Sequence, residues 1–380
     1  MSDRPYKIAL VAGEASSDLI GATLIEDLLQ IYPDAEILAV GGQQIKHSGA
    51  RLLLDNEVFS VMGLAEVLKD LPRLLRTKKQ VVKDLLAFAP DVFIGVDSPD
   101  LNFAMAKDMQ RHGIPVIHYV SPSVWAWRSK RKYKMAGFID CLLTLFPFEV
   151  AIYEDTAIQA RFVGHPLASR IPVNVDKVAA KAALGVSAKP LMAVLPGSRN
   201  REIKQLMPVF AQAIKQLNLG DRWQLVSSNV SPEKVALVQS LAAQEGLSLH
   251  WVDDTSALLQ AADFALLGSG TVALEAMLCK TPMVVAYRIS ALTWWLVNTF
   301  NMMQLPYYSL PNVLHGDFLV PEVMQNDLTT TQLARACQQV MEQADQSSLI
   351  QRFTELHQQL LPDHPNQAAQ AVSGFMEQAC

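Results

Sequence analysis

Two short glycine-containing loops carry the residue types that bind phosphate groups. The first loop follows the apolar stretch 264–267 and consists of Gly268, Ser269, Gly270 and Thr271. Glycines let a ligand approach the main chain, and the free amides and dipole of a following helix favour an anion. Glu275 falls one turn into that helix, where its carboxylate could accept hydrogen bonds from a ribose. A tight strand-to-helix turn with a solvated glutamate is the alternative, and the loop matches neither a Walker loop nor GxGxxG.

The second loop follows the apolar stretch 191–195 and contains Arg199. An arginine in this position could neutralise a diphosphate through charge-assisted hydrogen bonds. In a group transfer, that contact would stabilise the leaving group as its charge develops. The alternative is an ordinary surface arginine, but two loops of this type in one predicted sheet favour phosphate binding.

Asp97 ends the apolar stretch 92–96 and precedes Ser98 and Pro99. A carboxylate at the end of a strand could take a proton from an incoming hydroxyl group. An Asx turn or a helix cap is an equally good interpretation of this pattern. His118 lies inside another apolar stretch, which is more typical of a core histidine than of a catalyst.

A third feature is an apolar helical pattern followed closely by basic residues. The apolar positions are Leu64, Val67, Leu68, Leu71, Leu74 and Leu75. This composition is that of an amphipathic helix at a membrane interface, although a core-facing helix is the more common origin of such a pattern. A second basic and aromatic segment, 125–134, contains no acidic residue. The uncharged stretch 289–314 contains several asparagines and prolines, so it predicts a buried or interfacial helix and a loop rather than a membrane span.

Short apolar stretches alternate with helical patterns along most of the chain. The strand candidates are Lys7–Ala12, Glu36–Val40, Val92–Val96, Val116–Val120, Cys141–Leu145 and Ala160–Val163, then Leu191–Leu195, Gln224–Ser227, Leu247–Trp251, Phe264–Leu267 and Met283–Tyr287. Strands covered on both faces have this continuous apolar character, and alternation with helices predicts parallel sheets. The series is interrupted near 165–188. The sequence therefore predicts an α/β protein with two tandem Rossmann-like, doubly wound domains that face a cleft.

The predicted domains are 1–168 and 169–345, with C-terminal helices in 346–380 that could pack back on the first domain. The 380 residues are 50% apolar and 18% charged, which excludes intrinsic disorder. Neither half is basic overall, so nucleic acid is not an expected partner. The four cysteines lack metal-ligand spacing, and the first residues resemble a strand rather than a signal peptide, so we expect a cytoplasmic protein.

Taken together, the motifs resemble those of lipid-A-disaccharide synthases, which are membrane-associated glycosyltransferases of the GT-B architecture. The matching stretches are VAGEASSD (11–18), VMGLAEVL (61–68), GVDSPDLN (95–102), IHYVSPSVWAWR (117–128), FVGHP (162–166), LPGSR (195–199), GSGTVALE (268–275), PMVVAYR (282–288) and SLPNVL (309–314). Ser17 stands where the family usually has a glycine, which puts the geometry of the first loop in question.

The resemblance implies an inverting transfer from UDP-2,3-diacylglucosamine to 2,3-diacylglucosamine 1-phosphate. The products are a β-1,6-linked tetraacyl disaccharide 1-phosphate and UDP. It also implies the role of each matching residue: Asp97 is the base, Arg199 holds the diphosphate, Gly268 to Thr271 cradle the phosphates, Glu275 binds the ribose, and Glu14 and Asn312 bind substrate. No metal or cofactor is implied.

The resemblance further implies a peripheral position on the anionic cytoplasmic face of the inner membrane of a Gram-negative bacterium, with a homodimer as one possible assembly. The leucine-rich pattern at 64–75 would then receive acyl chains or enter lipid. Three alternatives remain at this point. One is another UDP-sugar enzyme on the same scaffold, either a 2-epimerase or the transferase that forms lipid II. The others are a two-domain solute-binding protein and a peripheral scaffold without catalytic activity.

Overall fold

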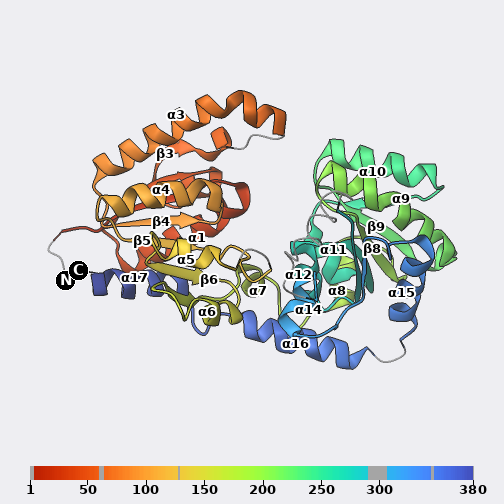
Figure 1. Ribbon diagram of the computed structural model, residues 1–380. Helices are drawn as coiled ribbons and strands as arrows, with labels where there is room; N and C mark the ends of the chain where they lie inside the picture. Colours follow the sequence, from red (N-terminus) through yellow and green to blue (C-terminus); the bar gives the residue numbers. More distant parts are fainter. Residues whose placement is uncertain (1–3, 60–63, 127–128, 290–305, 344–345, 380) are drawn as a thin grey trace. The chain divides into compact units, whose positions relative to one another are not determined.

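The computed structural model describes residues 4–59, 64–126, 129–289, 306–343 and 346–379 (Figure 1). The side chains of Ala15 and of residues 64–71 are also outside this description. Several sequence-based predictions therefore concern residues that are not described. These are most of the uncharged stretch 289–314, the Trp127–Arg128 part of the basic segment, and the side chains of Leu64, Val67, Leu68 and Leu71.

The chain forms two compact units. Residues 1–166 and 360–380 make the first unit, and residues 167–359 make the second. The sequence placed these boundaries at 168/169 and 345/346, and the later boundary differs because helix α16 (Ser347–Leu360) belongs to the second unit up to Gln359. Phe353 is buried there, and His357 Nε2 lies 2.8 Å from the carbonyl oxygen of Ala168.

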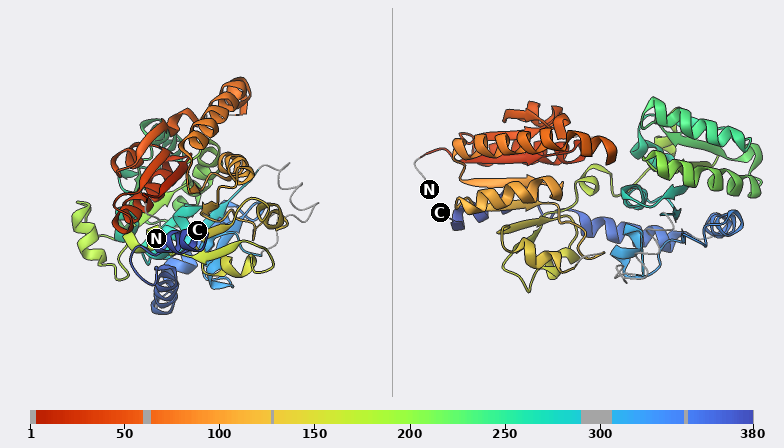
Figure 2. Two further views of the ribbon diagram at one scale, coloured as in Figure 1. Left: turned by 90° about the vertical axis from the view of Figure 1, so that its left-hand side faces the viewer. Right: turned by 45° about the horizontal axis from the view of Figure 1, so that its top comes forward.

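Helix α17 (Gln367–Ala379) brings the end of the chain back to the first unit. The Tyr32 hydroxyl lies 2.7 Å from Ser373 Oγ, and Arg161 Nη1 donates to the carbonyl oxygen of Ala371 at 3.1 Å. Figure 2 shows α17 beside the elements from the beginning of the chain. The first unit is therefore built from both ends of the sequence.

The first unit contains a seven-stranded parallel sheet in the order β3-β2-β1-β4-β5-β6-β7. Its strands are β1 (Lys7–Ala12), β2 (Glu36–Gly41), β3 (Arg51–Asp55), β4 (Val92–Val96), β5 (Val116–Tyr119), β6 (Cys141–Thr144) and β7 (Gln159–Phe162). Every residue of β4 is buried, as expected for a strand that helices cover on both faces. The other helical elements of this unit are α1 (Ala15–Ile31), α2 (Gln43–His47), η1 (Asn56–Phe59), α3 (Leu64–Phe88), α4 (Pro99–Arg111), α5 (Arg131–Met135), α6 (Phe148–Ile152) and the start of α7 (Pro166–Arg170).

The second unit contains a six-stranded parallel sheet in the order β10-β9-β8-β11-β12-β13. Its strands are β8 (Leu191–Leu195), β9 (Gln224–Ser228), β10 (His250–Val252), β11 (Phe264–Gly268), β12 (Met283–Tyr287) and β13 (Glu322–Met324). Its helical elements are α8 (Lys177–Ala183), α9 (Asn200–Gln216), η2 (Gly220–Arg222), α10 (Pro232–Gln244), α11 (Thr255–Ala261), α12 (Thr271–Leu278), α14 (Leu310–His315), α15 (Thr330–Glu342) and α16. The prediction of two doubly wound α/β domains is confirmed.

Each sheet has a point at which the order of its strands reverses. In the first sheet this point lies between β1 and β4, because the chain adds β2 and β3 on one side and β4 to β7 on the other. In the second sheet it lies between β8 and β11. Open α/β sheets bind ligands outside the carboxyl ends of the strands at such a switch point. The loops that follow β1, β4, β8 and β11 are therefore the expected ligand-binding positions of the two sheets.

Candidate functional site

Asp97 and Glu14 lie at the switch point of the first sheet. Strands β1 and β4 are hydrogen-bonded neighbours in which Ala12 pairs with Val96, so the loops that follow them leave the sheet side by side. The loop after β1 packs closely against the loop after β4 and the start of α4, because a Cβ atom on Gly13 would lie 3.3 Å from Ser98 Cβ and 2.6 Å from Leu101 Cδ2. The two predicted carboxylates of the first unit are thus brought to one edge of the sheet.

The environment of Asp97 raises the pKa of its carboxyl group. Burial is the main cause and the negative charge of Glu14 adds to it, while a hydrogen bond from the Ser98 main chain acts in the opposite direction. A carboxylate that binds a proton closer to neutral pH is better matched to general base catalysis than an exposed aspartate. The electrostatics are compatible with proton transfer at Asp97.

Ser17 maintains the first loop although it stands where the related motif has glycine. Its hydroxyl donates to the Glu14 carbonyl oxygen at 2.8 Å and accepts from the Glu14 N–H at 2.9 Å. Ser17 is fully buried in the first turn of α1, and it is not among the residues with positive φ. A serine therefore satisfies this position, and it fixes the main chain of Glu14 at the start of the helix.

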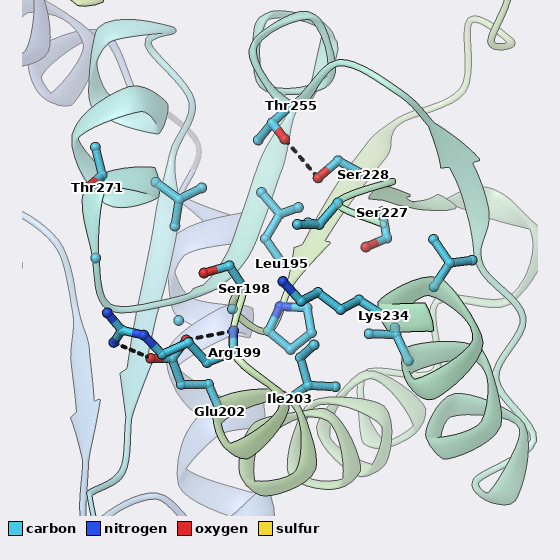
Figure 3. Close-up of a pocket in the computed structure, with 18 of the residues that line it drawn as sticks. Leu195, Ser198, Arg199, Glu202, Ile203, Ser227, Ser228, Lys234, Thr255 and Thr271 are labelled. Atoms are coloured by element: carbon cyan, nitrogen blue, oxygen red, sulfur yellow. Dashed lines mark hydrogen bonds and ion pairs between the residues drawn. The ribbon is translucent and has the colours of Figure 1, made fainter. Parts of the chain in front are cut away.

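The second unit contains a pocket of about 360 Å³ at the switch point of its sheet (Figure 3). Its walls include the loop after β8, residues 196–199, and the loop after β11, residues 269–271. Leu195 pairs with Leu267 at the ends of these strands, which places the two loops next to each other. The structure thus brings together Arg199, Gly268, Ser269, Gly270, Thr271 and Glu275, as the sequence predicts for these positions.

Arg199 is positioned at the start of α9 by Glu202. The Arg199 side chain is 80% exposed, and its Nη1 lies 3.1 Å from Glu202 Oε1. Glu202 in turn packs against Gly197, whose φ of +114° favours glycine, and a Cβ atom there would lie 2.7 Å from Glu202 Oε2. This arrangement keeps the guanidinium group at the pocket while leaving most of it accessible to a ligand.

The loop after β11 offers donors from the start of α12. The Ser269 N–H already donates to the Ala286 carbonyl oxygen at 3.0 Å, so this amide is used by the sheet. Thr271 begins the helix, and the first N–H groups of a helix have no partner within it. An anion at this loop would therefore be bound by main-chain donors from Gly270 onwards and by the Thr271 hydroxyl.

Glu275 lines the same pocket one turn into α12. Burial raises the pKa of its carboxyl group and the charge of Asp254 adds to this effect, whereas the Ser256 side chain and Arg170 lower it. A half-buried carboxylate in this position can accept hydrogen bonds from hydroxyl groups of a ligand. The role at the ribose that the resemblance implies for Glu275 stays a prediction.

The pocket also contains residues that the sequence did not single out. They come from the ends of β9 and β10 and from the helices that follow, and they are Ser227, Ser228, Lys234, Trp251 and Thr255. Thr255 Oγ1 donates to Ser228 Oγ at 2.8 Å, and Figure 3 shows the Lys234 side chain pointing from α10 into the pocket. No acidic partner of Lys234 occurs among the ion pairs of the described residues. The position of Ser227 at the end of a predicted strand could have identified it as a pocket residue, but no recognisable motif follows that strand.

Asn312 lies elsewhere in the second unit, and its side-chain amide is fully used within the protein. Its Nδ2 donates to the Val320 carbonyl oxygen at 2.9 Å and to Glu322 Oε1 at 2.8 Å. Its Oδ1 accepts from the N–H groups of Leu319 and Val320, each at 2.8 Å. Both N–H groups and both lone pairs of the amide are therefore occupied. In this state Asn312 organises neighbouring main chain and does not line the pocket.

Helix α3 begins at Leu64, and its first turns extend beyond the strands of its unit (Figures 1 and 2). Leu74 is half-buried, and Leu75 is 56% exposed. In the residues that the structure describes, no helix combines the length and apolar content needed to cross a bilayer. The described part of α3 thus presents at least one large apolar side chain to solvent.

The basic segment 125–134 is less free than its sequence indicates. Lys132 Nζ lies 2.7 Å from Asp155 Oδ1, and Arg131 Nη2 lies 3.7 Å from Asp100 Oδ1. These acids are distant in sequence, so the absence of acids within the segment did not show that its charges are unpaired. Trp125 is also engaged, because its Nε1 donates to the buried Glu149 at 3.2 Å.

Metal ligands were not predicted, and in the described part of the chain no three His, Cys, Asp or Glu side chains are grouped closely enough to hold a metal ion. The candidate functional groups of the described residues are a half-buried carboxylate in the first unit and a pocket lined by cationic and hydroxyl side chains in the second. The pocket combines an arginine, a lysine, a helix N-terminus and several hydroxyl groups.

Comparison with known proteins gives a consistent result over nearly the whole chain. The family model for lipid-A-disaccharide synthetase matches residues 8–372. The lipid-A-disaccharide synthase of Pseudomonas fluorescens (strain Pf0-1) is 42% identical over 376 residues, which are 98% of both chains. That of Hahella chejuensis is 40% identical over 383 residues, covering 99% of this chain and 96% of the relative.

Solved structures with the same fold are much more distant in sequence. The S. aureus MnaA-UDP co-structure has a TM-score of 0.63 at 14% identity and covers 98% of this chain and 96% of that one. The UDP-GlcNAc 2-epimerase of Neisseria meningitidis bound to UDP-GlcNAc has a TM-score of 0.61 at 12% identity, covering 98% and 100%. Acinetobacter baumannii MurG has a TM-score of 0.58 at 13% identity, also covering 98% and 100%. At these identities the likeness establishes the fold alone.

Proposed function

The chain belongs to the lipid-A-disaccharide synthase family and is a GT-B glycosyltransferase that forms the lipid A disaccharide; from this premise we propose how its residues carry out the reaction. The donor is UDP-2,3-diacylglucosamine and the acceptor is 2,3-diacylglucosamine 1-phosphate. The product is the β-1,6-linked tetraacyl disaccharide 1-phosphate. The roles of individual residues follow from the chemistry of each site.

Asp97 removes the proton from the 6-hydroxyl group of the acceptor. As the O–H bond breaks, the acceptor oxygen forms a bond to C1 of the donor sugar on the face opposite to UDP. The bond between C1 and the diphosphate oxygen breaks at the same time, and its electron pair leaves with UDP. A single displacement inverts the anomeric centre, so one base is sufficient. The burial that raises the pKa of Asp97 also increases its basicity for this step.

The second unit binds the UDP part of the donor and stabilises it as it leaves. Arg199, Lys234 and the N-terminus of α12 supply positive charge and hydrogen-bond donors to the diphosphate. Donors that are fixed before the reaction stabilise the charge that develops on the leaving diphosphate. Glu275 accepts hydrogen bonds from the ribose, and Glu14 contributes to substrate binding in the first unit.

One observation carries this proposal more than any other. Both sheets reverse their strand order at the positions where the sequence places its chemistry, between β1 and β4 for Asp97 and between β8 and β11 for the phosphate loops. A scaffold without catalytic activity has no need for a half-buried carboxylate at one switch point and a cationic pocket at the other.

The nearest alternative is another UDP-sugar enzyme on this scaffold, such as a 2-epimerase or the transferase that forms lipid II. The UDP-GlcNAc 2-epimerase of Neisseria meningitidis and Acinetobacter baumannii MurG share the fold, at identities of 12 and 13%. The synthases, in contrast, match nearly the full chain at about 40% identity. The sequence relationship therefore favours disaccharide formation over both alternatives.

Acylated substrates require access to a membrane, and we place this contact at the start of α3. Exposed Leu75 and the preceding apolar positions of the helix would enter the lipid, while the nearby basic residues would attract an anionic surface. This arrangement supports a peripheral location on the cytoplasmic face of the inner membrane. It adds membrane binding to the function of the first unit.

The direct test is to incubate the purified protein with UDP-2,3-diacylglucosamine and 2,3-diacylglucosamine 1-phosphate in mixed micelles. We expect release of UDP together with a tetraacyl disaccharide phosphate detected by mass spectrometry. Asp97→Asn should reduce turnover to a small residual rate while UDP still binds. Release of UDP without disaccharide would refute the transfer, and normal turnover by Asp97→Asn would remove Asp97 as the base.

A further inference from the structure

The main chain at Asp97 adopts an unusual conformation. Asp97 has a φ of 49° and Ser98 a φ of 42°, so two consecutive residues other than glycine lie in the left-handed region. Such residues cost on the order of 1 kcal/mol or more each, and they persist only where surrounding contacts hold them. The contacts that hold this turn therefore determine where the Asp97 carboxylate points.

Asn102 supplies two of these contacts. It lies in the first turns of α4, and its side chain is fully buried. Its Nδ2 donates to the carbonyl oxygen of Val96 at 3.1 Å and to that of Asp97 at 2.7 Å. These two carbonyl groups flank the Asp97 residue on both sides. One amide group therefore fixes the orientation of both peptide groups that define the turn.

Buried polar atoms around Asn102 lack hydrogen-bond partners, which lowers the stability of this part of the fold. Among the buried side-chain atoms of the described residues, four have no hydrogen-bond partner: Asn102 Oδ1, Ser98 Oγ and His118 Nε2 in the first unit, and Trp251 Nε1 in the second. Buried polar atoms without partners are rare in proteins because each one destabilises the fold. Three of them next to a strained turn are typical of a segment that is retained for function.

Gly95 leaves room for the Asn102 side chain. A Cβ atom on Gly95 would lie 3.0 Å from Asn102 Cβ and 3.1 Å from Asn102 Cγ. Because Gly95 is in the buried strand β4, the Asn102 side chain has little space to move away. The absence of a side chain at position 95 is thus part of the same arrangement.

We propose that Asn102 is a positioning residue, whose amide holds the Val96 and Asp97 carbonyl groups and thereby aims the Asp97 carboxylate at the acceptor hydroxyl group. This inference rests on the proposed role of Asp97 as the base. Asn102 does not contact the reacting atoms in this scheme. It acts entirely through the conformation of the turn.

The test is Asn102→Leu, which keeps the size of the side chain and removes both donors. We expect kcat to fall on the order of 100-fold, as for a base displaced by about 1 Å, while KM for both substrates stays within about threefold. The acid limb of the kcat profile should move to lower pH, because a relaxed turn exposes Asp97 to solvent and lowers its raised pKa. Asn102→Ser restores one donor and should recover part of kcat.

A double-mutant cycle separates positioning from a general structural effect. If Asn102 acts through Asp97, Asn102→Leu should have little further effect on the residual turnover of Asp97→Asn. Gly95→Ala is an independent variant that pushes on Asn102 and should lower kcat in the same way. The matched control is Asp140→Ala, which removes the acceptor of a 2.8 Å hydrogen bond from the Val116 N–H at the amino end of the neighbouring strand β5 and should change only the melting temperature.

Three results would overturn the inference. They are an unchanged kcat in a folded Asn102→Leu protein, multiplicative effects of the Asn102 and Asp97 substitutions, and a similar loss of kcat in Asp140→Ala. The first of these, together with an inactive Asp97→Asn, would refute the positioning role and leave Asp97 as the base. An active Asp97→Asn would instead refute the base itself.

Discussion

Replacing Arg199 with alanine should weaken UDP binding strongly and change stability very little. The pair between Arg199 and Glu202 joins the residue before α9 to its first turn and leaves Arg199 80% exposed, so it contributes about 0.3–0.5 kcal/mol to stability. For a unit the size of residues 167–359, that corresponds to a change of about 1–2 °C in melting temperature. A charge-assisted hydrogen bond to a diphosphate is worth about 1.5–3 kcal/mol, so the Kd for UDP should rise about 10- to 150-fold.

The assay is isothermal titration of UDP at constant salt, with thermal unfolding measured on the same samples. Arg352→Ala is the matched control, because Arg352 and Glu355 form the same type of pair, 2.7 Å apart, on α16 of the same unit. This control should show a similarly small change in melting temperature and an unchanged Kd. The reasoning would be refuted if Arg199→Ala changed Kd by less than threefold, or if both variants weakened UDP binding equally.

Other expectations concern stability and membrane binding. Gly197→Ala should lower both the melting temperature and UDP affinity, since φ is +114° and Glu202 Oε2 lies 2.7 Å from the new Cβ; full retention of both would contradict this. Burial lowers the pKa of Lys280 to about 8 from its ordinary value of 10.5, so between these values the unfolded chain binds more protons and the free energy of unfolding should rise with pH. We expect the free energy of unfolding, measured in urea from pH 7 to 10.5, to rise by on the order of 3 kcal/mol more in the unmodified protein than in Lys280→Met. The same pH dependence in both proteins would contradict this. Leu75→Ser should reduce sedimentation with anionic vesicles, whereas Val178→Ser, at an apolar site that is even more exposed (80% against 56%), should not; equal effects would remove α3 as the membrane contact.

The sequence predicted the central strands well because burial on both faces leaves a continuous apolar pattern. The edge strands β3 and β13 were not predicted, since Arg51 is exposed and Glu322 is half-buried, which interrupts that pattern. The predicted end of the second unit, residue 345, also differs from the observed end, residue 359. Helix α16 contacts this unit through side chains such as His357, which lies 2.8 Å from the main chain of Ala168, far away in the sequence. Elements are therefore predictable where their own residues determine burial, and less so where another segment covers them.

The positions of the two glycine-containing loops of the pocket were predictable because each one directly follows a buried strand. Lys234 was not, since its place in the pocket depends on β9 lying next to β8, and the sequence does not state this order. The same limitation explains the basic segment, where Lys132 is paired with Asp155 from a different part of the chain. The spacing of residues in the sequence identifies the candidate residues of one loop. The residues that neighbouring strands and their helices add to the pocket become known only from the strand order.

Asn312 is joined to the loop after β11 by hydrogen bonds within the protein. Glu322, which accepts a hydrogen bond from the Asn312 amide, also accepts from the N–H groups of Tyr308 and Ser309. The Tyr308 carbonyl oxygen in turn accepts from Ser269 Oγ, at a longer distance of 3.5 Å. The amide of Asn312 is therefore connected to the phosphate loop through a chain of hydrogen bonds. All four hydrogen-bonding groups of the amide are occupied, so binding substrate directly would require Asn312 to break a buried hydrogen bond, which costs about 1–3 kcal/mol. We therefore propose that Asn312 contributes to donor binding only through the position of this loop.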